Sequence, residues 1–235
     1  MQCRIADLIV EVPAAGDLVP RCRDYRCDES SSADITISTE KFRPNAWQGL
    51  NPNDYVYCES GSHFHFHLLR FGGMMLHASA VVVEDRAYLF SAPSGTGKST
   101  HTRLWQQMLG EKAQIINDDK PALRCIDGVW YAYGTPWCGK DGININRKAR
   151  LAGICFLKQA PHNRIRRLTN QEAVQNIIWQ TMRRFRLTES MDRMLSNVDN
   201  LVRNIPIFEL ENCPEIAAAQ MSYETMRRAA EEKGL

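Results

Sequence analysis

Ser94-Gly95-Thr96-Gly97-Lys98-Ser99-Thr100 is the stretch of this sequence that decides its expected fold. The apolar residues 87–91 before it predict a strand, and residues 100–109 after it predict a helix. A glycine-rich turn between a strand and a helix is typical of a P-loop, because its backbone N–H groups can face a phosphate at the positive helix end. Ala92 stands where the first glycine of the full pattern is expected, which alanine tolerates at negative φ. The alternative is a chance glycine-rich turn.

The residue types of this stretch predict a nucleotide site. In a P-loop, Lys98 reaches the β- and γ-phosphates, and the Ser99 hydroxyl binds Mg²⁺. ATP and Mg²⁺ are therefore the expected cofactors. The residues expected to bind the nucleotide are Ser94, Gly95, Thr96, Gly97, Lys98, Ser99 and Thr100.

Two adjacent carboxylates follow about twenty residues later. Asp118 and Asp119 come after the apolar residues Ile115 and Ile116, which predict a buried strand. One carboxylate can bind Mg²⁺ together with Ser99, while the other takes a proton from an acceptor hydroxyl. The sequence does not assign the two roles, and an acidic pair on a plain surface is the alternative.

These motifs occur in the order found in a known family. The stretch His77-Ala78-Ser79, residues 94–99 and the pair Asp118-Asp119 resemble the kinase domain of HPr kinase/phosphorylase, which shares a core with ATP-dependent phosphoenolpyruvate carboxykinases. The resemblance covers about residues 74–158. It implies an α/β fold with a P-loop core of this type, and a possible homo-oligomer. It also implies a catalytic set of His77, Lys98, Asp118 and Asp119. For His77 the alternative is a histidine hydrogen-bonded within the core.

The rest of the chain divides into two expected regions. Residues 1–72 predict a β-rich N-terminal region, and residues 73–235 predict a kinase-like domain that ends in helices. Asp127-Gly128 between two apolar runs predicts a hairpin over residues 122–133. Thr169 with Glu172 forms a capping box that opens a helix to about Phe185. Further helices are expected over residues 189–202 and 214–233, with strands over 151–157 and 206–210.

A loop rich in glycine and proline follows the predicted hairpin. It covers residues 133–147. Its polar side chains, which offer cations and amides, are Lys140, Asn144, Asn146 and Arg147. We expect an active-site loop in which Lys140 and Arg147 contact the substrate; a plain connector is the alternative. HPr kinases carry a different stretch here, and the segment resembles uncharacterised HPr-kinase-like proteins instead. This departure argues against HPr itself as the substrate.

Composition excludes several classes of protein. The chain has 235 residues and a net charge of +2, and no apolar run approaches the roughly 20 residues that span a bilayer. Without a signal-like start, a cytoplasmic protein with no membrane partner is expected, and its eight cysteines are expected to be thiols. No nucleic-acid-binding module is visible. Residues 147–186 hold ten basic side chains against one acidic, which indicates either an anionic partner or a solvated basic face.

Three weaker patterns complete the reading. His63, His65 and His67 alternate with phenylalanines, which predicts one face of a strand and, less often, a metal site. Trp179 is expected in the core, as is the helical pattern of Ile216, Ala217, Met221 and Met226. Arg103 either touches the nucleotide or occupies an ordinary helix position.

The expected function is ATP-dependent transfer of the γ-phosphate to a hydroxyl acceptor. The acceptor is a serine of a protein or peptide, or a small alcohol. A nucleotide-sensing module without transfer activity is one alternative, although it needs only one carboxylate for Mg²⁺. A P-loop ATPase is the other, although no switch segment or coupling domain is visible.

Overall fold

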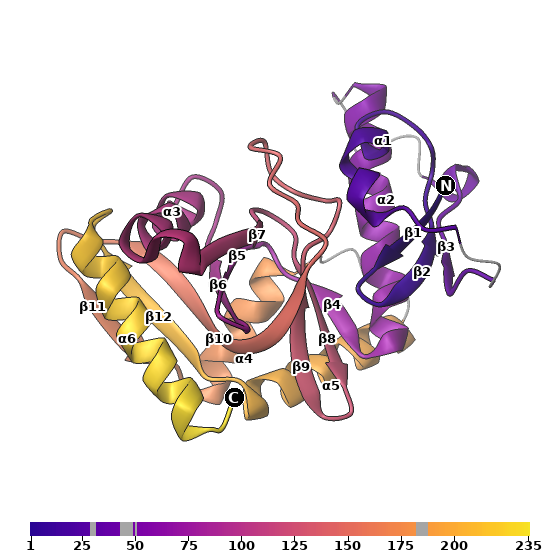
Figure 1. Ribbon diagram of the computed structural model, residues 1–235. Helices are drawn as coiled ribbons and strands as arrows, with labels where there is room; N and C mark the ends of the chain where they lie inside the picture. Colours follow the sequence, from indigo (N-terminus) through magenta and orange to yellow (C-terminus); the bar gives the residue numbers. More distant parts are fainter. Residues whose placement is uncertain (29–31, 43–48, 50, 182–187) are drawn as a thin grey trace.

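The computed structural model describes every residue except 29–31, 43–48, 50 and 182–187. The fold is mixed α/β, with a three-stranded sheet near the N-terminus and a larger, curled nine-stranded sheet (Figure 1). Along the chain the elements are β1 (Gln2–Ile5), β2 (Leu8–Glu11), α1 (Leu18–Arg21), β3 (Ile35–Thr36), α2 (Pro52–Leu68), β4 (Gly73–Met75), β5 (Ala78–Val83), β6 (Arg86–Ser91), α3 (Lys98–Leu109), β7 (Ala113–Asn117), β8 (Ala122–Ile126), β9 (Val129–Tyr133), β10 (Lys148–Gln159), β11 (Arg164–Arg167), α4 (Asn170–Gln180), α5 (Thr188–Asn204), β12 (Ile207–Asn212) and α6 (Ile216–Glu232).

The N-terminal region combines a small sheet with a long helix. Strands β1 and β2 form a hairpin whose turn residues Ala6 and Asp7 both have positive φ, as a two-residue turn of type I′ requires. Strand β3 adds in parallel to β2. The β-rich character expected for residues 1–72 is therefore limited to these strands, because the 17-residue helix α2 contributes more residues.

The three alternating histidines lie on helix α2, so the strand predicted for them is wrong. The Asn51 side chain caps this helix by accepting hydrogen bonds from the backbone N–H groups of Asn53 and Asp54. Pro52 occupies the first turn, where a missing N–H costs nothing. His65 is fully buried and accepts a hydrogen bond of 3.0 Å from the backbone N of Met75. Within the described residues, no three His, Cys, Asp or Glu side chains gather as a metal site would require.

The strands of the large sheet run in the order β4-β8-β9-β10-β6-β5-β7, and β12 pairs with both β10 and β11. The predicted hairpin is confirmed as β8 and β9, with Asp127 and Gly128 at positive φ. Strand β10 pairs antiparallel with β9 through its first residues, and in parallel with β6 and β12 further on. The sequence patterns did not predict β4 and β11.

Side chains alternate between the two faces of this sheet. On β5 and β6, Ala80 and Leu89 belong to a core with helices α4 and α5, whereas Val81 and Phe90 belong to a core with α3 and α6. Figure 1 shows α3 and α6 on one side of the sheet. The domain is thus a sheet covered by helices on both faces.

Two predictions about the helices needed correction. The capping box of Thr169 and Glu172 is confirmed, but α4 ends at Gln180, and the expected end at Phe185 lies outside the described residues. Trp179 was expected in the core but is 63% exposed, because it follows the buried Ile177 by two positions and so points away from the sheet.

Helix α6 packs through only part of the predicted pattern, since Met226 is buried and Met221 packs against the same core. Ile216 is 37% exposed and Ala217 is exposed too, while Met226 is buried as expected. The helix lies on the sheet through small side chains, which permit close approach of its backbone. The buried residues are Ala218, Ala219, Ser222, Met226, Ala229 and Ala230.

The N-terminal region packs directly on the large sheet. Its core includes Phe64 and Leu68 of α2 together with Met75, Ala122 and Trp137 from beyond residue 72. The Tyr133 hydroxyl donates to Asp7 Oδ2 over 2.8 Å. A domain boundary between residues 72 and 73 stays a prediction. Among the helices of the described residues, none has the length and apolar character needed to span a bilayer.

Candidate functional site

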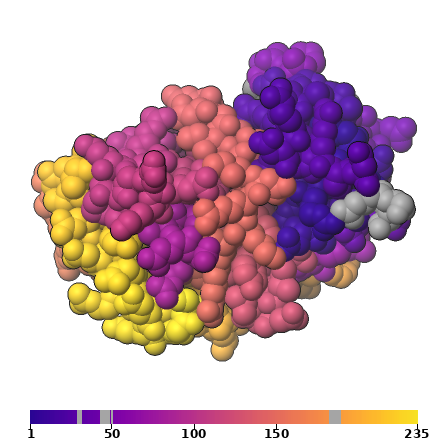
Figure 2. All heavy atoms as spheres, viewed as in Figure 1, coloured from indigo at the N-terminus to yellow at the C-terminus, as the bar shows by residue number. Residues whose placement is uncertain are grey.

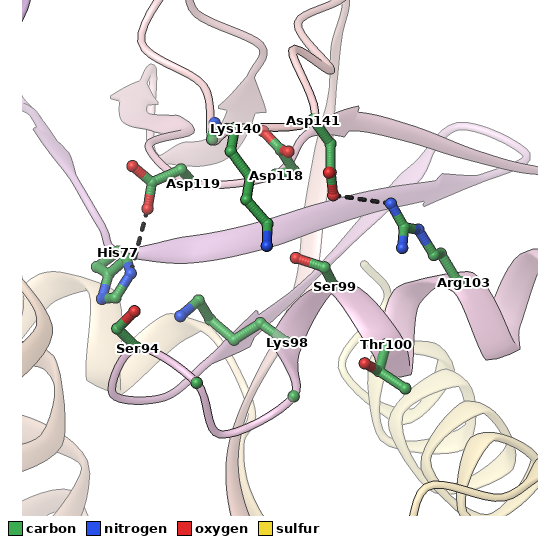
Figure 3. Close-up of a pocket in the computed structure, with 13 residues that line it drawn as sticks. His77, Ser94, Lys98, Ser99, Thr100, Arg103, Asp118, Asp119, Lys140 and Asp141 are labelled. Atoms are coloured by element: carbon green, nitrogen blue, oxygen red, sulfur yellow. Dashed lines mark hydrogen bonds and ion pairs between the residues drawn. The ribbon is translucent and has the colours of Figure 1, made fainter.

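A cavity of about 630 Å³ opens where β6 leads into α3, which is within the range of small-molecule sites (Figure 3). Its far wall is the loop of residues 134–147, whose salmon atoms lie between the α3 segment and the indigo N-terminal region in Figure 2. The cavity is lined by His77, Ser94, Gly95, Gly97, Lys98, Ser99, Thr100, Arg103, Asp118, Asp119, Gly139, Lys140 and Asp141.

The turn between β6 and α3 depends on two glycines. Gly95 and Gly97 have φ values of +81° and +111°, a region that other residues rarely adopt. Nothing lies within 4 Å of where a Cβ would stand at either position, so the backbone on this side of the turn is open. Helix α3 begins at Lys98, and the first N–H groups of a helix have no acceptor within it. The turn therefore offers backbone donors and a positive helix end to an anion.

Lys98 extends from the start of α3 into the floor of the cavity. It is 8% exposed, and its Nζ donates a hydrogen bond of 3.0 Å to the carbonyl of Ala92. Burial lowers the pKa of Lys98 to about 8, while the nearby Asp119 carboxylate opposes this shift. An anionic ligand in the cavity would favour the charged ammonium in the same way.

Asp118 lies at the end of β7, between the sheet and the long loop. It is 5% exposed, and its Oδ1 accepts a short hydrogen bond of 2.6 Å from the backbone N of Gly139. Burial raises the pKa of Asp118, and the hydrogen bond from Gly139 opposes the shift. The carboxylate is thus fixed in direction by the loop it faces.

The side chains of His77 and Lys120 contact the Asp119 carboxylate. Its Oδ1 lies 3.1 Å from Nε2 of His77, and Lys120 Nζ lies 3.0 Å from each carboxylate oxygen. Burial alone would raise the pKa of Asp119, but the hydrogen bond from His77 and the charge of Lys120 outweigh burial and lower it to about 2. Asp119 is therefore ionised at neutral pH.

His77 lines the cavity with a partly exposed side chain. Its Nδ1 lies 3.1 Å from Oε1 of Gln180, and its backbone N donates to the carbonyl of the same residue over 2.8 Å. The Ser91 hydroxyl donates to the His77 carbonyl. These contacts orient the imidazole toward Asp119, so His77 belongs to the cavity wall rather than to the core (Figure 3).

The two cations expected to bind substrate lie in different places. Lys140 lines the cavity, and Figure 3 shows its amine directed toward Lys98 and Ser99. Arg147 does not line it, so the structure does not place Arg147 beside the other expected site residues, and its substrate contact stays a prediction. Its guanidinium binds Gln114 Oε1 over 2.7 Å and the Glu84 carbonyl over 2.9 Å, at the opposite end of β5 and β6. The chain reaches that end of the sheet because β10 begins directly after Arg147.

The amides expected on this loop hold it in place instead of facing the cavity. Asn144 and Asn146 donate to the carbonyls of Arg21 and Asp24 in the N-terminal region, over 2.7 and 3.0 Å. Gly134 passes so close to the Ile145 carbonyl that any Cβ would clash with it. The loop is therefore a folded wall of the cavity and not a plain connector.

Arg103 contributes to the cavity through an ion pair. Its Nη2 lies 2.7 Å from Asp141 Oδ2, which links α3 to the loop across the cavity mouth (Figure 3). Asp141 and Gly139 were not predicted as site residues, and Thr96, which was, does not line the cavity. Thr96 instead uses its N–H for a hydrogen bond of 3.3 Å to the Pro93 carbonyl within the turn.

Much of the described basic stretch is paired within the protein. Arg166 binds Glu172 and Glu209 over 2.9 Å, and Lys158 binds Glu209 over 2.6 Å. Arg183, Arg184 and Arg186 lie outside the described residues. Lys158 and Arg166 are thus ion-paired with acidic residues of β12 and α4, and binding of an anionic partner to the basic stretch stays a prediction.

The family model described as "ScmC: SynChlorMet cassette protein ScmC" matches residues 60–215. The chain belongs to this ScmC family. The match includes the whole cavity and helix α2 from residue 60, so the site lies within the part common to ScmC proteins. No curated protein matches the chain.

One solved structure with a detectable likeness is titled "Structure of the Hpr(Ser) kinase/phosphatase from Coxiella burnetii". It is 13% identical to this ScmC family member, covers 68% of this chain and 92% of its own, and has a TM-score of 0.38. A likeness this low supports no statement about the site. The resemblance to HPr kinases therefore stays an expectation carried by the sequence motifs.

Several residues that shape the site were not predicted. Asn117 is fully buried; its Oδ1 accepts from the backbone N atoms of Asp119 and Lys120, and its Nδ2 donates to the Thr135 carbonyl. This one side chain fixes both the turn with the carboxylates and the start of the loop. An asparagine directly before two acids is a turn signal. Gln180 carries no such signal, because it reaches His77 only through the tertiary fold.

Proposed function

We propose that this ScmC family member is an ATP-dependent phosphotransferase that moves the γ-phosphate of ATP to a hydroxyl acceptor. The observation that carries the proposal is the single cavity shared by the turn of residues 94–97, Lys98, Lys140, the two aspartates and His77. Backbone donors and two lysines suit a polyphosphate, and the carboxylates suit its metal ion and a proton.

The open turn is the part that fits the triphosphate. Gly95 and Gly97 line the cavity with open space where a Cβ would stand, and the start of α3 adds its dipole. Lys98 would exchange its present contact with the Ala92 carbonyl for the phosphates. Lys140 approaches from the opposite wall, so charge on the transferred group would meet an ammonium on both sides (Figure 3).

Ser99 and Asp118 are the residues we assign to Mg²⁺. A hydroxyl and one or two carboxylates are the protein ligands that this ion takes when phosphates and waters fill its other positions. Asp118 is directed by the Gly139 amide, whereas both oxygens of Asp119 already contact Lys120. Bound Mg²⁺ would neutralise phosphate charge and orient the phosphates for transfer.

Asp119 and His77 are the residues we assign to the acceptor. The acceptor oxygen would attack the γ-phosphorus, the bond to the β-phosphate oxygen would break, and ADP would leave. The hydroxyl proton would pass to the Asp119 carboxylate, which is ionised at neutral pH. His77 would keep that carboxylate aimed at the acceptor through the contact of 3.1 Å. The acceptor is a serine of a protein or peptide, or a small alcohol.

The decisive experiment follows the labelled γ-phosphate of ATP. The protein is incubated with Mg²⁺, labelled ATP and a cell extract separated into macromolecules and metabolites, beside the variants Lys98→Ala and Asp119→Asn. Label in either fraction that disappears with both variants supports the phosphotransferase and identifies the acceptor class. Arg147→Ala is the matched control, because this cation lies outside the cavity.

Two other outcomes would reject transfer. Release of inorganic phosphate without any labelled acceptor would indicate an ATPase. ATP binding with neither release nor transfer would indicate a nucleotide sensor, and the roles given to His77 and Asp119 would be lost.

A further inference from the structure

One peptide unit of the long loop is held from both sides. Its carbonyl, on Cys138, accepts hydrogen bonds from the Tyr57 hydroxyl over 2.6 Å and from Arg21 Nη1 over 2.8 Å. Its N–H, on Gly139, donates to Asp118 over 2.6 Å. The N-terminal region and a cavity carboxylate are therefore hydrogen-bonded to opposite ends of the same planar peptide group.

Planarity makes this arrangement a rigid link. The carbonyl and N–H of a trans peptide point in opposite directions and cannot rotate separately, because the C–N bond has partial double-bond character. Fixing the Cys138 oxygen therefore fixes the direction in which the Gly139 N–H points. Strong donors on the carbonyl also polarise the group and strengthen the hydrogen bond at its other end.

The two donors form a unit of their own. Arg21 Nη1 lies 3.0 Å from the Tyr57 hydroxyl oxygen, and the guanidinium carbon lies 4.6 Å from the centre of the tyrosine ring. Burial raises the pKa of Tyr57, so its hydroxyl keeps the proton that it donates to Cys138. Arg21 ends α1 and Tyr57 lies on α2, so both come from the N-terminal region.

The loop depends on such contacts, because residues 134–147 form neither helix nor strand. Beside the held peptide, the Trp137 indole donates a hydrogen bond to the Ser60 hydroxyl. It also stacks on Phe64, with 4.8 Å between the ring centroids. Directly after the Cys138–Gly139 peptide, Lys140 enters the cavity. The same segment that docks on the N-terminal region thus delivers the cavity wall.

We propose that Arg21 and Tyr57 are positioning residues, which orient Asp118 through the Cys138–Gly139 peptide and so set the cavity from the N-terminal region. The consequence for catalysis rests on the proposed function, whereas the orientation of Asp118 does not. Loss of either donor should loosen the Gly139 amide and leave the Asp118 carboxylate less well aimed.

The orientation can be measured in the protein without any ligand. Cys138-Gly139 is the only Cys-Gly step in the sequence, so labelling cysteine carbonyls with ¹³C and glycine nitrogens with ¹⁵N gives one amide signal in a carbonyl-correlated NMR spectrum. We expect Tyr57→Phe and Arg21→Met to move both the carbonyl and the amide-proton shifts upfield. Asp118→Asn should move the amide proton most strongly.

Tyr133→Phe is the matched control. It also removes a tyrosine hydroxyl that joins the N-terminal region to the sheet, at Asp7, and should leave the Cys138–Gly139 signal in place. If Tyr57→Phe moves the carbonyl shift but not the amide-proton shift, the peptide transmits nothing and the proposal is overturned. Arg21→Lys keeps the positive charge and serves as a second variant in case Arg21→Met fails to fold.

Kinetics then separate this inference from the proposed function. Given transfer by the wild type, we expect Tyr57→Phe to lower kcat about threefold to tenfold, the effect of one hydrogen bond. ATP binding should change less. If both variants shift the NMR signal but keep wild-type kcat, positioning has no part in the reaction. If the wild type transfers nothing, the proposed function fails, and the NMR result still decides the positioning.

Discussion

His77 and Asp119 face each other across the ends of the paired strands β5 and β7, with 3.1 Å between Nε2 and Oδ1. The Asp119 carbonyl also accepts a hydrogen bond from the backbone N of Ala78, so the two residues are joined through backbone and side chain. Neither strand alone could create this pair. It arises because antiparallel pairing brings the start of one strand beside the end of the other.

The His77–Asp119 contact leads to a prediction about turnover. His77→Asn should lower the rate of phosphate transfer about 100-fold, because Asp119 loses the partner that directs it. ATP affinity, measured by calorimetry, should stay within about threefold of the wild type, since the turn of residues 94–97 is untouched. His162→Asn is the control, because that imidazole is exposed and pairs with Glu211. Equal transfer rates for His77→Asn and the wild type would remove His77 from the reaction.

Asn117 is predicted to stabilise the site strongly. Asn117→Ala removes the acceptor for two backbone N–H groups and the donor to Thr135, and should lower the free energy of unfolding by about 3 kcal/mol. Urea denaturation followed by circular dichroism measures the change. Asn204→Ala, on the exposed end of α5, should change it by less than about 0.5 kcal/mol. A loss at Asn117 as small as that at Asn204 would contradict the assigned role.

Lys140 and Arg147 provide a test of cavity geometry. Lys140→Met should weaken ATP binding or raise the KM for ATP about tenfold, because one ammonium facing the phosphates is lost. Arg147→Met should leave both quantities within about twofold, since its guanidinium binds Gln114 and Glu84 at the far end of the strands. Calorimetry with ATP and Mg²⁺ measures both variants, and equal effects would show that Lys140 does not face the nucleotide.

Acid should destabilise the protein through His65. Burial lowers the pKa of His65 to about 3 in the folded protein, whereas an unfolded histidine keeps an ordinary pKa near 6.5. The unfolded chain therefore binds the proton first, and the contribution of His65 to stability, complete above about pH 6.5, is lost as pH falls from there toward 3. Between pH 7 and pH 5 the loss from this residue is about 2 kcal/mol.

The matched variant for this prediction is His65→Asn, which keeps an acceptor near the backbone N of Met75. Urea denaturation at pH 7 and pH 5 should give a smaller difference for the variant than for the wild type. His101 remains in both proteins and contributes in the same direction, because burial lowers its pKa to about 4. An unchanged difference would mean that His65 binds a proton in the folded state.

Local patterns predicted the parts of the fold that local chemistry determines. The hairpin of β8 and β9 matches residue for residue, because Asp127-Gly128 selects a turn that also sets the register. The capping box of α4 is local in the same sense. The alternation at His63–His67 was misleading, because a pattern of only five residues fits the period of a strand and that of a helix equally well. The signal for a helix was Asn51-Pro52 upstream, where an N-cap residue precedes a proline in the first turn.

The candidate site was predictable wherever a motif carried it. Lys98, Ser99, Asp118 and Asp119 come from short stretches with fixed spacing, and the structure brings all four to one cavity. Arg21 and Tyr57 could not be found this way, because their contacts with Cys138 join segments far apart in the chain. That Arg147 lies outside the cavity could not be predicted, because the sequence shows its charge but not where its side chain points.

The long strand β10 has a consequence for how the protein folds. Strand β6, which leads into the turn of residues 94–97, pairs on one side with its neighbour β5 and on the other with β10. The first pairing closes a short loop, whereas the second closes a long one and carries the larger entropy cost. During synthesis, the β5–β6 hairpin can form early, but its second edge stays open until β10 has left the ribosome. A pause in translation before β10 should therefore prolong the time in which that edge is free to aggregate.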